Sequence, residues 1–378
     1  MTRLLIVDDS PLMRRLLSEI FSAAGDFELA VARDADEALA QLNRFKPDVV
    51  TLDIHMPGMD GLACLDRIMV ERPCPVVMVS SLTEEGAEET LDAMALGAVD
   101  FFPKPRGAVS IAIEAVAPDL VETVRAASKA RISRARRLTE RVRLRGQLAE
   151  GRARVERASP LRRTPPAPPA RTVFEHAVQS GEAADRLVLI GTSTGGPPAL
   201  DAVLGALPSD FPCGIVVAQH MPASFTGPLA RRLDKLCPLP VAEVTTLTSI
   251  LAGHVYIGRG DADLLISRRS GQLVALPAPS SPDHHWHPSV ERLVDSAMGQ
   301  VRPVDLIGVL MTGMGSDGSK AMTQLHAAGG QTIAEAEESA VVWGMPGELV
   351  AAGGADWIVP LPGIADRLQR LIPYAPDP

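Results

Sequence analysis

Short runs of aliphatic residues recur along the whole chain, and the clearest of them lead directly into Gly, Ser, Thr, His or Asp. Such runs are typical of strands buried on both faces of a parallel sheet. In the first third of the chain they predict strands at 3–7, 29–32, 49–52, 76–80 and 100–102. Helical patterns alternate with these runs at 11–24, 35–45, 86–96 and near 118–128. The alternation predicts five parallel strands joined by right-handed crossovers, with helices on both faces.

The last half of the chain repeats this alternation without repeating the sequence. The strongest strand candidates are 187–190, 214–219 and 306–311, and weaker ones are 255–257, 264–267, 332–334 and 356–359. We therefore expect a second α/β unit with a parallel sheet, and we place the boundaries at 1–124, 125–184 and 185–378.

Charge separates the middle segment from its neighbours. Residues 125–171 carry a net charge of +12, whereas the rest of the chain carries −21 within an overall −9. Two acidic domains are poor candidates for binding nucleic acid, because phosphates reward clustered basic residues. The stretch 131–157 is compatible with a basic helix, and 160–169 is a proline-rich spacer. This linker is either a solvated tether or an arm that docks on the acidic domains and sets their relative orientation.

The cysteines are expected to be buried thiols, because no two of them form a C-x-x-C pair. They are Cys64, Cys74, Cys213 and Cys237. The first residues do not resemble a signal peptide, and no apolar run reaches the roughly 18 residues of a membrane span. We expect a cytoplasmic protein.

Polar residues follow the predicted strands of the first unit and form one candidate site. Asp8 and Asp9 follow the first strand, Asp53 ends the third, Ser80 ends the fourth and Lys104 lies just beyond the fifth. The carboxyl ends of parallel strands meet at one edge of a sheet, so these side chains should converge. Singly, each could be a helix cap or a turn residue. Together, three carboxylates predict a Mg²⁺ site beside a phosphoryl acceptor at Asp53, with Lys104 and Ser80 contacting the added group.

The second unit supplies a nucleophile, a base and an acid in the same way. Ser193 follows the strand at 187–190, His220 follows 214–219, and Asp317 follows 306–311. A serine hydroxyl needs an adjacent base, which His220 provides, and Asp317 would orient the imidazole. Glycines beside Ser193 and Asp317 leave backbone N–H groups for an oxyanion hole. The spacing predicts a Ser/His/Asp hydrolase.

Other interpretations of these motifs are less favoured. The segment 191–196 could cradle a phosphate at a helix start, but it matches neither G-x-G-x-x-G nor a P-loop. His220 alone could be a structural histidine. His284, His285 and His287 could suggest a metal, but they lie in an expected loop with no thiolate nearby.

The motifs of the first unit resemble those of response-regulator receiver domains. They are Val-Asp-Asp-Ser at 7–10, Asp-Ile-His-Met-Pro-Gly-Met-Asp-Gly at 53–61 and Lys-Pro at 104–105. The resemblance implies a flavodoxin-like fold, phosphorylation of Asp53, and Mg²⁺ held by Asp8, Asp9 and Asp53. It also implies that Phe101 is the aromatic switch position. His55 departs from the pattern, since relatives usually carry Glu there.

The second unit resembles the chemotaxis protein-glutamate methylesterase domain. The matching segments are 191–197, 218–221, 288–290, 311–318 and 344–346. With the receiver, this reproduces the architecture of the chemotaxis protein-glutamate methylesterase/protein-glutamine glutaminase family. The resemblance implies two doubly wound parallel-sheet domains, the second Rossmann-like, joined by the basic linker. Trp286 departs from the family, where Arg is common.

The resemblance also implies the activity and the partners. The family hydrolyses glutamate γ-methyl esters on chemoreceptors, releasing methanol, and deamidates receptor glutamines. It would use Ser193, His220 and Asp317, with the Met314 amide as an oxyanion donor and Thr194 as a supporting hydroxyl. The esterase reaction needs no cofactor. A chemotaxis histidine kinase would be the phosphodonor, and contact with the membrane would occur only through receptors.

Two other function classes and one regulatory hypothesis follow from the sequence. A transcriptional regulator would need a helix-turn-helix in a basic carboxyl-terminal domain, which the acidic 185–378 segment does not favour. A non-catalytic receptor-binding scaffold would not need the three triad positions. For the enzyme, we expect the unphosphorylated receiver to cover the Ser193 crevice. Phosphorylation of Asp53 would then rearrange Ser80 and Phe101 and open it.

Overall fold

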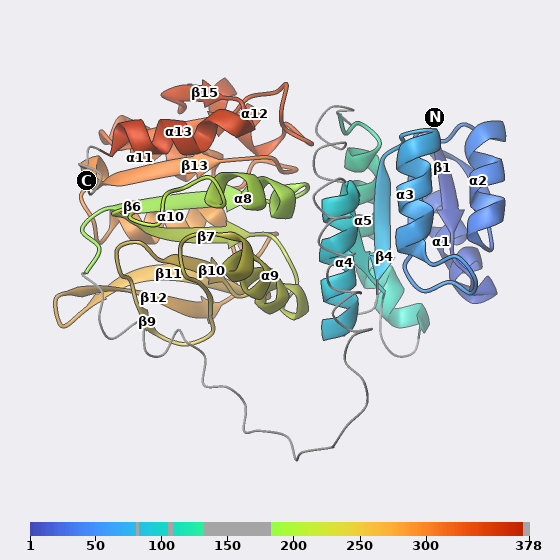
Figure 1. Ribbon diagram of the computed structural model, residues 1–378, viewed down its shortest axis with the longest axis horizontal. Helices are drawn as coiled ribbons and strands as arrows, with labels where there is room; N and C mark the ends of the chain where they lie inside the picture. Colours follow the sequence, from blue (N-terminus) through green and yellow to red (C-terminus); the bar gives the residue numbers. More distant parts are fainter. Residues whose placement is uncertain (81–82, 105–108, 132–182, 373–378) are drawn as a thin grey trace, which may run out of the picture.

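The computed structural model describes residues 1–80, 83–104, 109–131 and 183–372. These residues form two α/β units that lie side by side, one toward each end of the molecule (Figure 1). We call the unit of β1–β5 the receiver, after the resemblance of its motifs, and the unit of β6–β15 the larger unit. Most of the predicted basic linker, 132–182, lies outside the described residues, so the two interpretations of it stay predictions.

The first unit has the five-stranded parallel sheet that the sequence predicts, in the order β2-β1-β3-β4-β5. The strands are β1 (Thr2–Val7), β2 (Phe27–Ala32), β3 (Val49–Asp53), β4 (Val76–Ser80) and β5 (Asp100–Pro103). The helices are α1 (Pro11–Ala24), α2 (Ala35–Arg44), α3 (Gly61–Glu71), α4 (Glu84–Leu96) and α5 (Val109–Ala127). Side chains of Ser10, Asp34, Asp60 and Thr83 cap the first four helices. The last helix is longer than predicted, because Pro118 lies inside it and not at its start.

The second unit is built on a seven-stranded parallel sheet in the order β15-β14-β13-β6-β7-β10-β8. Its strands are β6 (Leu187–Thr192), β7 (Gly214–Gln219), β8 (Val241–Val244), β10 (Val255–Gly258), β13 (Leu306–Leu310), β14 (Gln331–Glu335) and β15 (Trp357–Val359). The α-helices are α8 (Gly196–Leu204), α9 (Ala223–Leu236), α10 (Val290–Met298), α11 (Ser319–Ala327), α12 (Met345–Ala351) and α13 (Leu361–Leu371). The order places β6 between β13 and β7, so the segments that follow these three strands are neighbours.

One part of the second unit was not anticipated. The strand predicted at 264–267 belongs to β11 (Ala262–Arg269), which pairs antiparallel with β12 (Gln272–Pro279), and β12 pairs with β9 (Thr248–Ser249). These strands form a separate three-stranded sheet. The turn between β11 and β12 has φ values of 48° at Ser270 and 85° at Gly271. Two positive φ angles in a two-residue turn join adjacent antiparallel strands, and they direct this segment out of the parallel sheet.

The cysteine and membrane predictions can be checked on the described residues. Cys64, Cys74 and Cys213 are buried as expected, whereas Cys237 is only half-buried. Burial raises the pKa of the Cys64 and Cys74 thiols to about 12, so both stay protonated. Among the described helices, none is long and apolar enough to cross a membrane.

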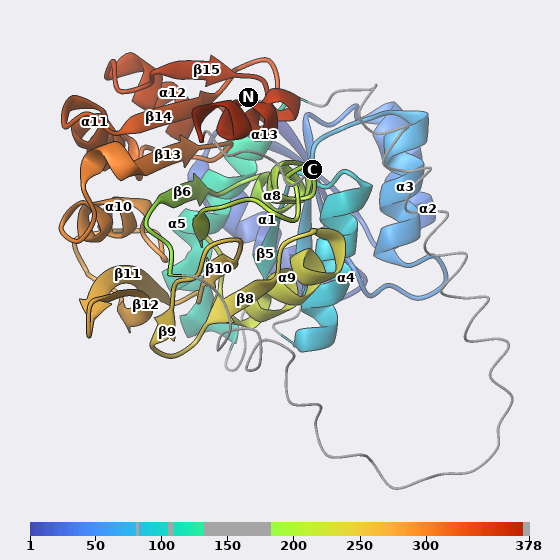
Figure 2. The same cartoon turned by 60° about the vertical axis from the view of Figure 1, so that its left-hand side comes forward.

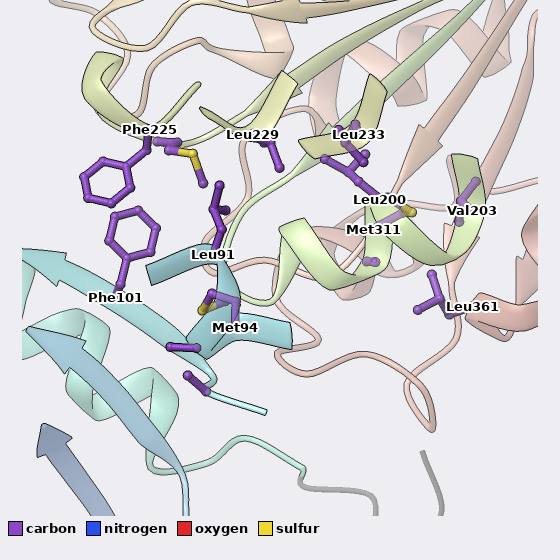
Figure 3. Packing of buried hydrophobic residues seen from close by; sticks show 14 of the residues in the cluster. Leu91, Met94, Phe101, Leu200, Val203, Phe225, Leu229, Leu233, Met311 and Leu361 are labelled. Atoms are coloured by element: carbon purple, nitrogen blue, oxygen red, sulfur yellow. The ribbon is translucent and has the colours of Figure 1, made fainter. Parts of the chain in front are cut away.

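The two units share an apolar interface. Helix α4 of the receiver lies beside α9 of the larger unit, as both views show (Figures 1 and 2). Leu91 and Met94 face the side of α9 that carries Leu229 and Leu233, and all four belong to one buried cluster (Figure 3). The ring of Phe101 packs on the ring of Phe225 with a centroid distance of 4.3 Å. These contacts place the α4–β5 side of the receiver against the larger unit.

Charged pairs surround this apolar contact. Arg232 of α9 lies 3.1 Å from Asp92 of α4 and 3.2 Å from Asp201 of its own unit, and its side chain is 20% exposed. Burial raises the pKa of both carboxyls, although the guanidinium opposes this. Arg131 binds Glu337 more peripherally, at 2.6 Å. Because exposed ion pairs contribute little, we expect Arg232 to contribute more to docking than the other ion pairs described across this interface.

We expect Arg232→Glu to loosen the docked arrangement, because it places a third carboxylate beside Asp92 and Asp201. Amide hydrogen exchange should become faster in α4 and α9 and should stay unchanged in β1. Arg67→Glu is the matched control, since the partner of Arg67, Glu71, lies on the same helix at 2.5 Å. Equal exchange in α4 for the Arg232 variant and the native protein would contradict this role.

Candidate active site

The acidic residues of the receiver meet at the carboxyl ends of β1 and β3. One oxygen from each of Asp8, Asp9 and Asp53 lies within 4.8 Å of the others. Asp8 and Asp53 are buried, and Asp9 is exposed. The Lys104 ammonium lies 2.7 Å from Asp53 Oδ2 and 3.1 Å from Asp8 Oδ2. The convergence predicted for these four side chains is therefore present.

The electrostatics of this pocket suit a divalent cation. Burial raises the pKa of Asp53, the charge of Asp8 adds to this, and Lys104 opposes it. Asp8 Oδ2 is buried, and its one close polar neighbour among the described contacts is the Lys104 ammonium at 3.1 Å. Three carboxylates and one ammonium leave an excess of negative charge, and their oxygens are the ligands that hard cations prefer. The donor set fits the expected metal.

Ser80 and Phe101 lie between this pocket and the larger unit. Ser80 is fully buried, and its hydroxyl donates to the Gly86 carbonyl in the first turns of α4. Its own carbonyl accepts from the Lys104 amide at 2.6 Å. Phe101, on β5, is 9% exposed and contacts Phe225. Both predicted switch residues therefore contact the elements that dock on the larger unit.

In the larger unit, Ser193 lies just after β6, between the segments that follow β13 and β7. Its amide donates to the Thr312 carbonyl at 3.0 Å. A Cβ atom at Gly313 would lie 2.8 Å from Ser193 Cβ and 2.3 Å from Met345 Sδ. Only glycine at 313 leaves room for the backbone there to lie this close to the side chains of Ser193 and Met345.

His220 and Asp317 are directly paired. His220 Nε2 lies 2.8 Å from Asp317 Oδ2, and the carboxylate also accepts the amides of Val290 at 2.7 Å and Glu291 at 3.2 Å and the Ser289 hydroxyl at 3.0 Å. Burial alone would raise the pKa of Asp317, but these hydrogen bonds outweigh it and lower the pKa. Asp317 is therefore ionised and accepts the Nε2 proton, which leaves the lone pair on Nδ1.

Ser193 and His220 open into one cavity of about 450 Å³. The buried Nδ1 of His220 has no hydrogen-bond partner, so the Ser193 hydroxyl is not bonded to it in this structure. Such bonds often form only when substrate is bound. Met314 and Thr194 also line the cavity. The roles that the resemblance implies for them stay predictions.

Gln219 is a residue that sequence reasoning missed. Its side-chain amide donates to the carbonyl of Ser193 at 3.1 Å and to that of His220 at 2.9 Å, and the residue is 1% exposed. It therefore ties together the backbones of the two residues whose side chains must meet. In the sequence, Gln219 ends an apolar run and lies within the matching segment 218–221, but neither feature indicated what its side chain binds.

The receiver forms one wall of the cavity. Asp100, the first residue of β5, accepts a hydrogen bond of 2.5 Å from the hydroxyl of Thr194, the residue next to Ser193. Burial raises the pKa of Asp100 to about 6, against the opposing effect of the Thr194 hydrogen bond. No sequence pattern indicated this residue, because the contact joins two separate domains.

The histidine cluster does not form a metal site. His287 Nδ1 lies 2.9 Å from Asp263 Oδ1, and His285 Nε2 lies 3.1 Å from Asp119 Oδ1 on α5. Within the described parts of the chain, the only group with the geometry to hold a metal is that of Asp8, Asp9 and Asp53.

The first unit combines a five-stranded parallel sheet with a pocket of aspartates, and it docks on an α/β unit. The crevice of that second unit holds Ser193 and a His–Asp pair. This combination defines a response regulator with a hydrolase domain. Residues 4–114 match the family described as response regulator receiver domain, and residues 188–368 match CheB methylesterase. The chain is 52% identical over 367 residues to "Protein-glutamate methylesterase/protein-glutamine glutaminase 2" of Rhodopseudomonas palustris, covering 97% of this chain and 96% of that protein. It is also 50% identical over 369 residues to "Protein-glutamate methylesterase/protein-glutamine glutaminase 3" of Rhodospirillum rubrum. That match covers 98% of this chain and 96% of the relative.

Solved structures give similar matches. The CheB methylesterase catalytic domain of Thermotoga maritima is 38% identical and covers 50% of this chain and 100% of its own, with a TM-score of 0.48. The response regulator domain of Thermotoga maritima CheB is 44% identical, and the match covers 35% of this chain and 98% of that domain, with a TM-score of 0.33. On the strength of its full-length relatives, the chain belongs to the CheB family of protein-glutamate methylesterases/protein-glutamine glutaminases. This assignment decides between the function classes in favour of the enzyme.

We expect Asp100→Asn to change how stability depends on pH. The pKa of about 6 in the folded protein lies above the ordinary 3.8, so folding favours the protonated acid. The stabilisation is complete below about pH 4 and is lost as pH rises through about 6. The neutral amide avoids that loss, so the melting temperature of the variant should rise relative to the native protein between about pH 4 and about pH 7. A difference in melting temperature between the variant and the native protein that does not change with pH across this range would contradict the burial of an ionisable Asp100.

Proposed function

We propose that the chain is a phosphorylation-gated hydrolase in which Ser193 is the nucleophile, His220 the general base and Asp317 the orienting acid. As a member of its family, the protein is a protein-glutamate methylesterase/protein-glutamine glutaminase that serves adaptation in chemotaxis. The observation that carries the assignment of roles is the 2.8 Å His220–Asp317 pair, which opens into the same cavity as Ser193.

The chemistry follows from the position of the protons. His220 Nδ1 takes the proton of the Ser193 hydroxyl as Oγ bonds to the ester carbonyl carbon. The C–OMe bond then breaks, His220 returns the proton, and methanol leaves. Water next attacks the acyl-serine and gives one proton to His220, which passes it to Ser193 Oγ as the C–Oγ bond breaks. The glutamic acid formed then loses its remaining proton to solvent and leaves as the carboxylate. With glutamine as substrate, the same steps release ammonia.

Backbone groups around the nucleophile support these steps. The Met314 amide is our proposed donor to the oxyanion, because Met314 lines the cavity beside Ser193. Thr194 is proposed as a supporting hydroxyl once its bond to Asp100 is released. The Gln219 side-chain amide, which donates to both backbone carbonyls, keeps Ser193 and His220 at a fixed separation during the reaction.

The substrates we propose are methylated glutamates and specific glutamines on chemoreceptors, and the phosphodonor is a chemotaxis histidine kinase. Both follow from membership of the family. Asp8, Asp9 and Asp53 would hold Mg²⁺, which would neutralise charge on the incoming phosphoryl group. Asp53 accepts that group, and Lys104 pairs with its oxygens.

The contacts around β5 support a gate operated from Asp53. A phosphoryl group there would compete for the Ser80 hydroxyl, which now holds Gly86 of α4. Asp100 begins the short strand β5 and accepts the Thr194 hydroxyl, and Lys104, which binds Asp53, follows the end of the same strand. Rearranging either end strains the docked face formed by Phe101 and α4, and the receiver withdraws from the crevice.

We expect Ser193→Ala to abolish methanol release from a methylated receptor fragment, with a loss of at least about a thousandfold. Phosphorylation of Asp53 and the melting temperature should stay unchanged, because alanine keeps the Cβ atom and removes only the hydroxyl. Ser316→Ala is the matched control, because Ser316 is exposed and is not among the residues that line the cavity. Substantial methanol release by the Ser193 variant would contradict the assignment of the nucleophile.

We expect Asp53→Asn to abolish activation while leaving the resting activity intact. A small phosphodonor with Mg²⁺ should raise methanol release by the native protein and should have no effect on the variant. The amide keeps the volume of the side chain but cannot accept the phosphoryl group. Equal activation of both proteins would contradict Asp53 as the acceptor.

A further inference from the structure

The loop between β12 and α10 is closed by one buried carboxylate. Asp263 accepts the Ser281 amide at 3.0 Å at the start of the loop, and His287 Nδ1 at 2.9 Å and the Ser289 amide at 2.8 Å at its end. Arg292 also contacts this carboxylate. Because every one of these partners belongs to the larger unit, the loop keeps its shape when the receiver withdraws.

This loop carries Trp286 over the proposed general base. The indole and the His220 imidazole lie nearly parallel, with an interplanar angle of 16° and a centroid distance of 6.1 Å. The His285 ring packs edge-on against the indole at 4.6 Å, and His285 also contacts Asp119 of the receiver. Trp286 therefore lies between the catalytic imidazole and the receiver in the docked state.

The proposed mechanism places the leaving group in the same part of the cavity. Methanol or ammonia must take its proton from His220, so the departing atom lies within hydrogen-bond reach of that ring. The larger unit lines the cavity with the apolar side chains of Met221, Pro222, Met314 and Trp286, and it also contributes polar residues that include Asp261, His285 and His287. Of these side chains, the Trp286 indole is the apolar one that lies parallel to the His220 ring. A methyl group gains by contact with such a surface. A carboxamide NH₂ that packs against the indole face finds no acceptor on that face, which is costly.

We propose that Trp286 is a specificity-determining residue that favours the glutamyl methyl ester over the glutamine amide. The inference rests on the proposed function, because it takes His220 as the proton donor to the leaving group. The same apolar surface disfavours the charged carboxylate product, since an ion loses hydration there without gaining a partner. Trp286 thus also promotes product release.

The test compares two reactions of one protein sample. The full-length chain, activated with a small phosphodonor and Mg²⁺, is given a receptor fragment carrying either γ-methyl glutamate or glutamine at one position. Methanol and ammonia release give kcat/KM for ester and for amide. Their ratio does not depend on the fraction of folded enzyme, so a partial folding defect cannot imitate a change in specificity.

We expect Trp286→Ala to lower the ester-to-amide ratio by about tenfold, because the apolar wall beside the leaving group is removed. Trp286→Phe should restore the ratio to within about twofold, since it keeps an aromatic face. Trp357→Ala, in the edge strand β15, is the matched control and should leave the ratio unchanged. An unchanged ratio in Trp286→Ala, whether both rates fall equally or neither falls, would overturn the proposal. A native protein that releases neither product would refute the proposed function itself.

Discussion

The ionised carboxylate of Asp317 is the constraint on which the catalytic crevice depends. It lies at the amino terminus of α10, where two backbone amides and the Ser289 hydroxyl stabilise its charge. A negative charge fixed there holds the proton on His220 Nε2 and leaves the other ring nitrogen available for Ser193. The His–Asp pair is thus set by the start of a helix as much as by the strands that precede its members.

Both units use the same property of parallel sheets. The carboxyl ends of β1 and β3 gather the aspartates of the receiver, and those of β6, β7 and β13 gather Ser193, His220 and Asp317, the proposed triad. The two sites are linked by the short strand β5. Lys104 follows one end of it and binds Asp53, and Asp100 at the other end binds Thr194. A change of charge at the first site therefore has a direct route to the second.

The wall that the receiver adds and the wall that the larger unit adds have different roles. Asp100 and Phe101 belong to the receiver, so in the proposed gate they leave the cavity when the receiver withdraws. The loop of Trp286 is held by its own unit through Asp263, so in the same proposal Trp286 stays beside His220. The two proposals thus assign regulation and specificity to different residues of one cavity.

The sequence by itself determined the two α/β units, the sheet edges at which polar residues gather, and most of the candidate residues that lie there. It could do so because Asp53 ends a buried strand and Ser193 and His220 directly follow two others, so strand position fixes where these residues lie. Only the tertiary structure revealed the Asp100–Thr194 bond, the Gln219 brace and the stacking of Trp286 on His220. These contacts join segments far apart in the chain, and neither periodicity nor spacing records which side chains packing will bring together.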